Sequence, residues 1–327
     1  MRALVTGSTG FLGLNLVSEL IKEGWEVYAF HRPSSDLKYL NRFAVKRIIG
    51  DIGDYSSLKS GIPQKLDALF HAAANTSLWK KNNPKQCEDN VLGTRNLVSC
   101  ALEKKTKKFI LTSSISSFGV HEEKIDESTS SNVLESKKAS HYDKTKYLAE
   151  KEVLQGVRQG LNAVILNPCR IMGPFDEKDW SLFVQDACRD KVIFVPSGTG
   201  MICHSRNVAR AHIRAVEKGG SGEKYLLGGP EATFKDIINE AQSILGKKKT
   251  NRVTPDWILW LAGYAMSVAS FFTKKPPLIT PETVRLLTET VTCRYQKAQQ
   301  ELGYKSPSLN ETIGEVIDWL RKEQSVS

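Results

Sequence analysis

The segment Leu4–Gly13, with the sequence LVTGSTGFLG, constrains the fold more than any other part of this chain. A short apolar strand runs into a turn with glycines at every third position, and a helix is expected from Phe11 onward. Glycines at such a junction let a phosphate group approach the backbone at a helix N-terminus. The segment therefore predicts a dinucleotide site, with the hydroxyls of Ser8 and Thr9 as further donors. The expected contacts are Gly7, Ser8, Thr9, Gly10, Phe11, Leu12 and Gly13.

Strand and helix signals alternate along the first 170 residues. Strands are expected at 3–6, 26–31, 44–49, 66–73, 108–113 and 162–166, and helices at 11–23, 84–105 and 142–158. This alternation is typical of right-handed crossovers between parallel strands. The expected fold class is α/β, a doubly wound parallel sheet of the Rossmann kind, with residues 1–170 as the dinucleotide-binding domain.

The regular alternation ends after Pro168. Sheet returns are expected near 205–230, in the form of a helix at 208–218 and a strand at 224–227. Residues 171–327 are otherwise expected to form a smaller, mainly helical C-terminal lobe that binds the substrate. Such a lobe would cover the carboxyl ends of the strands, where ligands bind in open α/β sheets.

The segment Trp257–Phe272 of this lobe carries no charged residue. A membrane span needs about 20 apolar residues, and this run is shorter and interrupted by Gly263, Ser267 and Ser270. A helix that packs on the lobe or lines an apolar cavity is the first expectation. Peripheral membrane contact through 257–272 remains open as the second, and a span is the least favoured interpretation.

The end of the second expected strand indicates which dinucleotide is bound. An NAD enzyme typically has an acidic residue there for the ribose hydroxyls, but this strand continues His31-Arg32-Pro33-Ser34-Ser35. Arg32, Ser34 and Ser35 suit a 2′-phosphate, with His31 as a further donor. NADP(H) is therefore favoured over NAD(H), although Arg32 as a plain surface residue of an NAD enzyme remains open.

Two further strand ends are expected to meet the dinucleotide. Asp51 and Ile52 follow the third strand, where they would hold the adenine edge. Small side chains end the fourth strand, where a dinucleotide would pass over it: Ala72, Ala73 and Ala74.

Tyr142 and Lys146 are four residues apart on an expected helix, so both project from one face. A nearby ammonium is expected to lower the pKa of the phenol, which would let Tyr142 exchange a proton with a carbonyl or alcohol oxygen. Lys146 would also hold the nicotinamide ribose. A strand ending in serines precedes this helix, and a serine hydroxyl there would bind the substrate oxygen. Spacing does not decide among Ser113, Ser114, Ser116 and Ser117.

Six ordered motifs resemble the extended short-chain dehydrogenase/reductase family, also known as the NAD-dependent epimerase/dehydratase family. They are TGSTGFLG, GDIGD around Asp51, HAAA at 71–74, NVLGT at 90–94, TSSISSFG at 112–119 and YDKTK at 142–146. The resemblance implies a catalytic trio of Ser114, Tyr142 and Lys146, and it implies cofactor contacts at Tyr142, Lys146, Asn167 and Pro168. The segments HRPSSDLKYL, NTSLW and GEKYLLGG are most similar to the dihydroflavonol-reductase-like subgroup.

Three functions are open on this basis. The first is an NADP(H)-dependent reductase or dehydrogenase acting on a ketone, aldehyde or alcohol of a moderately apolar small molecule. The second is a sugar-nucleotide epimerase or dehydratase with tightly bound NAD. Relatives of that kind often have arginine where Asn167 stands, which argues mildly against a nucleotide-sugar. The third is a non-catalytic dinucleotide-sensing or RNA-associated protein, which would not need a complete Ser114, Tyr142 and Lys146 set.

The charge pattern and the cysteine spacing limit which partners and which cellular compartment the sequence predicts. The net charge of +10 comes from short, scattered lysine clusters, so no nucleic acid partner is expected, and the charge forms a solvated surface that also attracts an anionic ligand. The six cysteines show no paired spacing and no secretory segment precedes the first strand, so reduced thiols and a cytoplasmic protein are expected. No spacing predicts a metal site. The helices at 84–105 and 142–158 leave a homodimer open.

Overall fold

The apolar runs of the sequence become the strands of one parallel sheet. In the computed structural model, which describes residues 1–324, seven strands follow the order β3-β2-β1-β4-β5-β6-β9, and all neighbours are parallel. Every residue of β4, β5 and β6, three of the five inner strands, is buried, as expected for a parallel sheet covered on both faces. The strands are β1 (Arg2–Thr6), β2 (Glu26–His31), β3 (Lys46–Ile49), β4 (Ala68–His71), β5 (Phe109–Thr112), β6 (Ala163–Pro168) and β9 (Lys224–Leu227).

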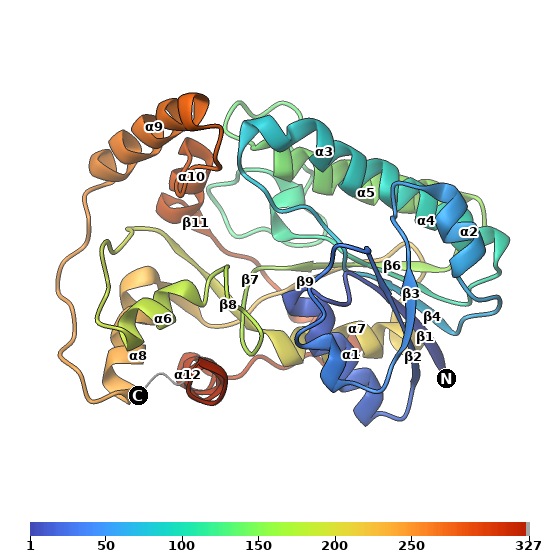
Figure 1. Cartoon of the computed structure of the whole chain (residues 1–327). Coiled ribbons are helices and arrows are strands. Elements are labelled where there is room, and N and C mark those ends of the chain that lie inside the picture. The colour runs from blue at the N-terminus through green and yellow to red at the C-terminus, as the bar shows by residue number, and fades with distance from the viewer. Residues whose placement is uncertain (325–327) are drawn as a thin grey trace.

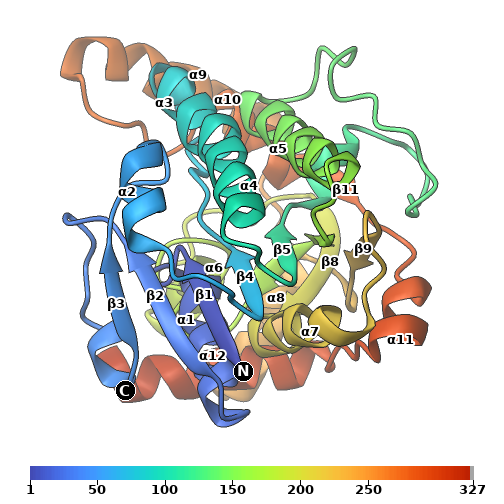
Figure 2. The same ribbon diagram turned by 90° about the vertical axis from the view of Figure 1, so that its right-hand side faces the viewer.

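Helices cover both faces of this sheet (Figure 2). The helices α1 (Phe11–Lys22) and α7 (Ser205–Lys218) pack together on one face, and α2 (Tyr55–Gly61), α4 (Gly93–Glu103) and α5 (His141–Arg158) pack on the other. Alternate residues of each strand enter the two apolar clusters: Val5 joins the cluster with α1, and Leu4 joins the cluster with α4. The expected doubly wound α/β fold is confirmed.

The C-terminal region adds helices and a small second sheet (Figure 1). The helices α6 (Leu182–Cys188), α8 (Phe234–Ile244) and α12 (Leu309–Gln324) pack together, and α9 (Asp256–Thr273) packs on α10 (Pro281–Thr288). α11 (Gln296–Leu302) packs near β9. The small sheet has the order β10-β8-β11, with β7 also paired to β8. Its strands are β7 (Arg170–Met172), β8 (Thr199–His204), β10 (Glu231–Thr233) and β11 (Thr290–Val291).

The long helix expected at 84–105 is present, but it contains a π-helical turn that was not expected. The chain forms α3 (Asn83–Cys87), a π-helical turn η3 (Glu88–Leu92), and then α4. The extra residue of a π turn rotates the side chains that follow it, and here it lies where Asn90 is buried. The Asn90 amide donates to the carbonyl of Asn75 and to the hydroxyl of Thr145 on α5. The π turn thus lies where the Asn90 side chain bonds to two other segments.

The uncharged run 257–272 forms α9, as expected for a helix on the lobe. Within residues 1–324, no helix has the length and hydropathy needed to cross a membrane. The six cysteines are all free thiols, in agreement with their unpaired spacing.

Candidate active site

The glycine turn brings β1, α1 and the end of β4 into close contact. Gly7 has φ +67°, and a Cβ there would lie 2.6 Å from the backbone nitrogen of Ala73. A Cβ at Gly13 would collide with the carbonyl oxygen of Gly7. Gly10 is the exposed N-cap of α1, and no side chain caps this helix end. The first turn of α1 therefore presents its backbone N–H groups to an incoming anion.

A cavity of about 590 Å³ lies at this helix end. Ten of the residues expected at the dinucleotide line it: Gly7, Thr9, Gly10, Arg32, Ser35, Asp51, Ile52, Ala72, Ala73 and Ala74. We call this cavity the dinucleotide cleft. Phe11, Leu12 and Gly13 belong to the first turn of α1 and are not among its lining residues.

The expected role of the Ser8 hydroxyl is not supported. Ser8 is fully buried, and its hydroxyl donates a hydrogen bond of 3.0 Å to the carbonyl oxygen of Phe30. This bond holds the glycine turn against the end of β2, so the hydroxyl is directed away from the cleft. Thr9 lines the cleft and remains the expected hydroxyl donor.

The end of β2 carries a buried ring nitrogen without a partner. His31 Nδ1 lies 3.0 Å from the carbonyl oxygen of Arg32, while Nε2 is buried and has no hydrogen bond within residues 1–324. His31, Arg32 and Ser35 all line the dinucleotide cleft, and the guanidinium of Arg32 is exposed. Because Nδ1 can only donate to that carbonyl, Nε2 of a neutral ring is an acceptor, and the exposed Arg32 side chain is the group at this end of the cleft that fits an anion.

The start of α5 fixes the position of Tyr142. Ser140 and Asp143 form a reciprocal capping box, in which the Asp143 N–H donates to Ser140 Oγ at 3.2 Å and the Ser140 N–H donates to Asp143 Oδ2 at 2.8 Å. Tyr142 lies in this first turn and Lys146 one turn later. The Lys146 ammonium donates to the carbonyl oxygen of Thr112 at 2.9 Å and lies 5.9 Å from the centre of the Tyr142 ring. The end of β5 and the first turns of α5 are thereby joined.

The four candidate serines after β5 have different surroundings. Ser113 and Ser117 are buried, and both donate to Glu150. The Ser114 hydroxyl is partly exposed and accepts from the N–H and the hydroxyl of Ser116, at 3.2 and 2.8 Å. A hydroxyl that accepts from its neighbours keeps its own proton available for a ligand. This arrangement favours Ser114 among the four.

Burial dominates the titration of Tyr142 and Lys146. It raises the pKa of Tyr142 above its usual value, and the neighbouring Asp143 adds to the increase, while the Ser114 hydroxyl opposes it. Burial also lowers the pKa of Lys146 to about 8, opposed by Glu150. The expected lowering of the Tyr142 pKa by Lys146 is thus absent, because burial is the largest influence on this pKa and raises it. Tyr142 is protonated at neutral pH.

Glu150 is a site residue that the sequence reasoning missed. It lies four residues after Lys146 on α5, is 1% exposed, and accepts from Ser113, Ser117, Asn167 and Lys224 at 2.5–2.6 Å. The sequence could have indicated Glu150, because positions 142, 146 and 150 share one helix face. The same network holds Asn167, where a cofactor contact is expected: the side chain is fully buried and its amide donates to Glu150, Ser117 and the carbonyl of Ser114, so the expected contact stays a prediction for the backbone. Pro168 follows it in the buried strand β6.

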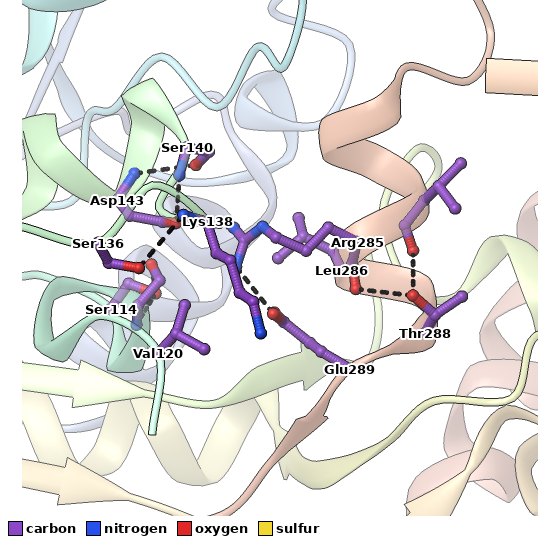
Figure 3. A network of polar contacts seen from close by, with 12 residues as sticks. Ser114, Val120, Ser136, Lys138, Ser140, Asp143, Arg285, Leu286, Thr288 and Glu289 are labelled. Atoms are coloured by element: carbon purple, nitrogen blue, oxygen red, sulfur yellow. Dashed lines mark hydrogen bonds and ion pairs between the residues drawn. The ribbon is translucent and has the colours of Figure 1, made fainter. Parts of the chain in front are cut away.

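A second cavity, of about 730 Å³, lies over Tyr142. We call it the substrate cavity. Its walls come from residues 77–83, from 137–144 and from α9 and α10, and Ser77 lines both this cavity and the dinucleotide cleft. Arg285 of α10 lies between Asp143 and Glu289, with ion pairs of 2.7 and 2.8 Å (Figure 3). The C-terminal lobe is thereby attached to the first turn of the helix that carries Tyr142.

Comparisons with known proteins agree with this architecture. The model of the NAD dependent epimerase/dehydratase family matches residues 3–228. A putative dihydroflavonol 4-reductase of Synechocystis is 30% identical over 97% of this chain and 94% of its own length. A farnesyl-dihydroquinoline-oxide ketoreductase of Stigmatella aurantiaca is 30% identical over 93% of this chain and 92% of its own length. The UDP-glucose 4-epimerase of Thermotoga maritima has the same fold, with a TM-score of 0.80, 22% identity and coverage of 98% of this chain and 99% of its own.

Proposed function

The chain belongs to the NAD-dependent epimerase/dehydratase family and is an NAD(P)-dependent oxidoreductase of the extended short-chain dehydrogenase/reductase type; we propose that it is an NADP(H)-dependent reductase of a ketone or aldehyde. The proposed substrate is a moderately apolar small molecule. One observation carries the proposal: Ser114 and Lys146 both lie beside Tyr142, and Tyr142 lines the substrate cavity, which shares Ser77 with the dinucleotide cleft. The ketoreductase and reductase names of the relatives support the direction of the reaction.

The chain's own groups supply binding and proton transfer. When bound, the dinucleotide would supply hydride to the carbonyl carbon of the substrate. The Ser114 hydroxyl would donate a hydrogen bond to the carbonyl oxygen and stabilise the negative charge that develops on it. Tyr142, protonated at neutral pH because burial raises its pKa, would deliver a proton to that oxygen. The Lys146 ammonium, fixed by the carbonyl of Thr112, would hold the ribose and favour the tyrosinate left after the transfer.

Arg32 is the residue with which the preference for the 2′-phosphate can be tested. We expect Arg32→Ser to raise the KM for NADPH by roughly 10–100-fold, because a charge-assisted hydrogen bond to the phosphate is lost. The KM for NADH should change little, since NADH has no phosphate at that position. Initial rates with both cofactors, at saturating ketone, measure the two constants.

Arg47→Ser is the matched control for this experiment. Arg47 is also exposed and close in sequence, but its side chain donates to Asn41 and does not line the dinucleotide cleft. It should leave both KM values unchanged. An equal rise in the two KM values with Arg32→Ser would remove the argument for the phosphorylated cofactor.

The pH dependence of reduction should follow Lys146. Its pKa of about 8 means that the ammonium is present below pH 8 and is lost as the pH rises through that value. Tyr142 keeps its proton over this range because its pKa is raised. We expect kcat/KM for reduction to fall above about pH 8, approaching tenfold per pH unit. In Lys146→Arg the guanidinium stays charged, so any remaining activity should show no such fall.

The activity itself is tested with NADPH and NADH against a panel of ketones, aldehydes and acyl-CoA esters. The expected result is consumption of NADPH in a one-to-one ratio with an alcohol product. Purified protein that retains NAD and converts a sugar nucleotide without net consumption of the cofactor would instead favour an epimerase. Binding of RNA with no turnover across the panel would favour a non-catalytic role.

A further inference from the structure

The outer face of α9 carries a continuous apolar stripe. Its side chains are between 59% and 81% exposed, and their spacing of three or four residues places them on one side of the helix. The stripe consists of Trp257, Leu261, Tyr264, Val268, Phe271 and Phe272. Leu278, five residues after the end of the helix, is 80% exposed as well. We call this surface the α9 stripe.

The opposite face of α9 already has its partner. Leu259 is buried in a small apolar cluster with Ile279 and Val284. Gly263 packs so closely that a Cβ there would lie 3.0 Å from the side chain of Val284 on α10. The helix therefore packs on α10 through its inner face, and α9 lies at one edge of the molecule (Figure 1), with the α9 stripe exposed. An exposed apolar area of this extent marks an interaction surface.

Basic side chains lie at the C-terminal end of the stripe and on the rim of the neighbouring cavity, where Lys80 is paired with Glu282. Lys274 and Lys275 follow the helix directly, are exposed, and have no ion pair within residues 1–324. The substrate cavity has an edge on the same helix, because Trp260 lines it, and its rim carries the exposed side chains of Lys80, Lys137 and Lys138. An apolar stripe with Trp, Tyr and Phe, bordered by lysines, has the composition of a helix that lies in a membrane interface.

We propose that the α9 stripe docks this protein on an anionic lipid surface. The helix would lie in the plane of the interface, with its apolar side chains in the headgroup–acyl boundary and the lysines against the headgroups. The cavity rim that carries Lys80, Lys137 and Lys138 would then face the same lipid surface. A second copy of this chain is the less favoured occupant, because each copy carries a net charge of +10 and the stripe is bordered by that charge. The proposal stands independently of the proposed reductase activity.

The test is flotation of the full chain with lipid vesicles at low ionic strength. We expect capture by vesicles of phosphatidylglycerol mixed with phosphatidylcholine, and weak or no capture by phosphatidylcholine alone. The double substitution Leu261→Asn with Val268→Asn should lower the affinity for the mixed vesicles roughly tenfold or more, since two apolar side chains no longer enter the interface. The double substitution Lys274→Glu with Lys275→Glu should lower it by at least as much.

Matched control variants distinguish binding through the α9 stripe from binding through apolar side chains or lysines elsewhere on the surface. Ile49→Ser removes an equally exposed apolar side chain at the end of β3, and Lys104→Glu with Lys105→Glu reverses an adjacent lysine pair at the end of α4. Both controls should float like the unaltered protein, and melting temperatures should show that all variants are folded. Equal loss of capture in the stripe variants and in the controls would overturn the proposal. The proposal would also be overturned if the protein bound neither vesicle type and changed from dimer to monomer when the stripe was altered. The stripe would then bind a second copy of this chain.

Discussion

Replacing Tyr142 by phenylalanine is expected to lower kcat by about 10²–10⁴-fold, because the proposed proton donor to the substrate oxygen is lost. The aromatic ring and its packing remain, so NADPH affinity, measured by fluorescence titration, should change by less than about twofold. The capping box of Ser140 and Asp143 does not involve the phenol, and α5 should start at the same residue.

Tyr147→Phe is the matched control for that substitution. Tyr147 lies on the same helix, where its ring contacts Lys151 and does not line the substrate cavity. It should retain the activity of the unaltered protein. If Tyr142→Phe kept its turnover and lost its affinity for NADPH, the proton-donor role would be wrong and Tyr142 would be a cofactor contact only.

The second large effect is expected at Glu150. Glu150→Leu leaves the hydroxyls of Ser113 and Ser117, the Asn167 amide and the Lys224 ammonium without their shared acceptor. We expect the free energy of unfolding to fall by about 2–4 kcal/mol. The lower end of this range applies if Lys224, which is 24% exposed, regains hydration. Urea unfolding followed by circular dichroism measures the change.

Glu152→Leu provides the comparison on the same helix. Glu152 forms a two-pronged ion pair with Arg95 at the surface, and such exposed pairs contribute at most about 1 kcal/mol. Unfolding of the Glu150 and Glu152 variants at the same urea concentration would mean that the buried network adds nothing beyond a surface pair.

The sequence predicts the centre of the main sheet well because the strands there are buried on both faces. The sequence of such a strand is an unbroken run of mostly apolar residues, and Phe109–Thr112 is the clearest example. The small sheet of the lobe was missed, since strands of two or three residues such as Thr290–Val291 are too short to show a period. The π turn at Glu88–Leu92 was missed for a different reason: the hydrogen bonds that Asn90 makes there reach residues distant in the sequence.

The residues of the candidate site also differ in how far the sequence alone could predict them. The glycine turn, Tyr142 and Lys146 are local patterns and are visible in the sequence, whereas the choice of Ser114 needed a family resemblance and is favoured by burial in the structure. Arg285 could not be anticipated, because its partner Asp143 lies 142 positions earlier in the chain. The assigned roles of these residues stay predictions until the variants are measured.

The Arg285 bridge has a consequence for how such an enzyme changes its substrate. The walls of the substrate cavity come from three separate segments, and the segment with Tyr142 is attached to α10 through the Arg285–Asp143 ion pair. Side chains on α9 and α10 that do not take part in this bridge can therefore be exchanged while the helix with the proton donor keeps its position. If the proposed roles hold, we expect substrate preference to follow the cavity-lining residues around Trp260, which is where a redesign of the binding preference would begin.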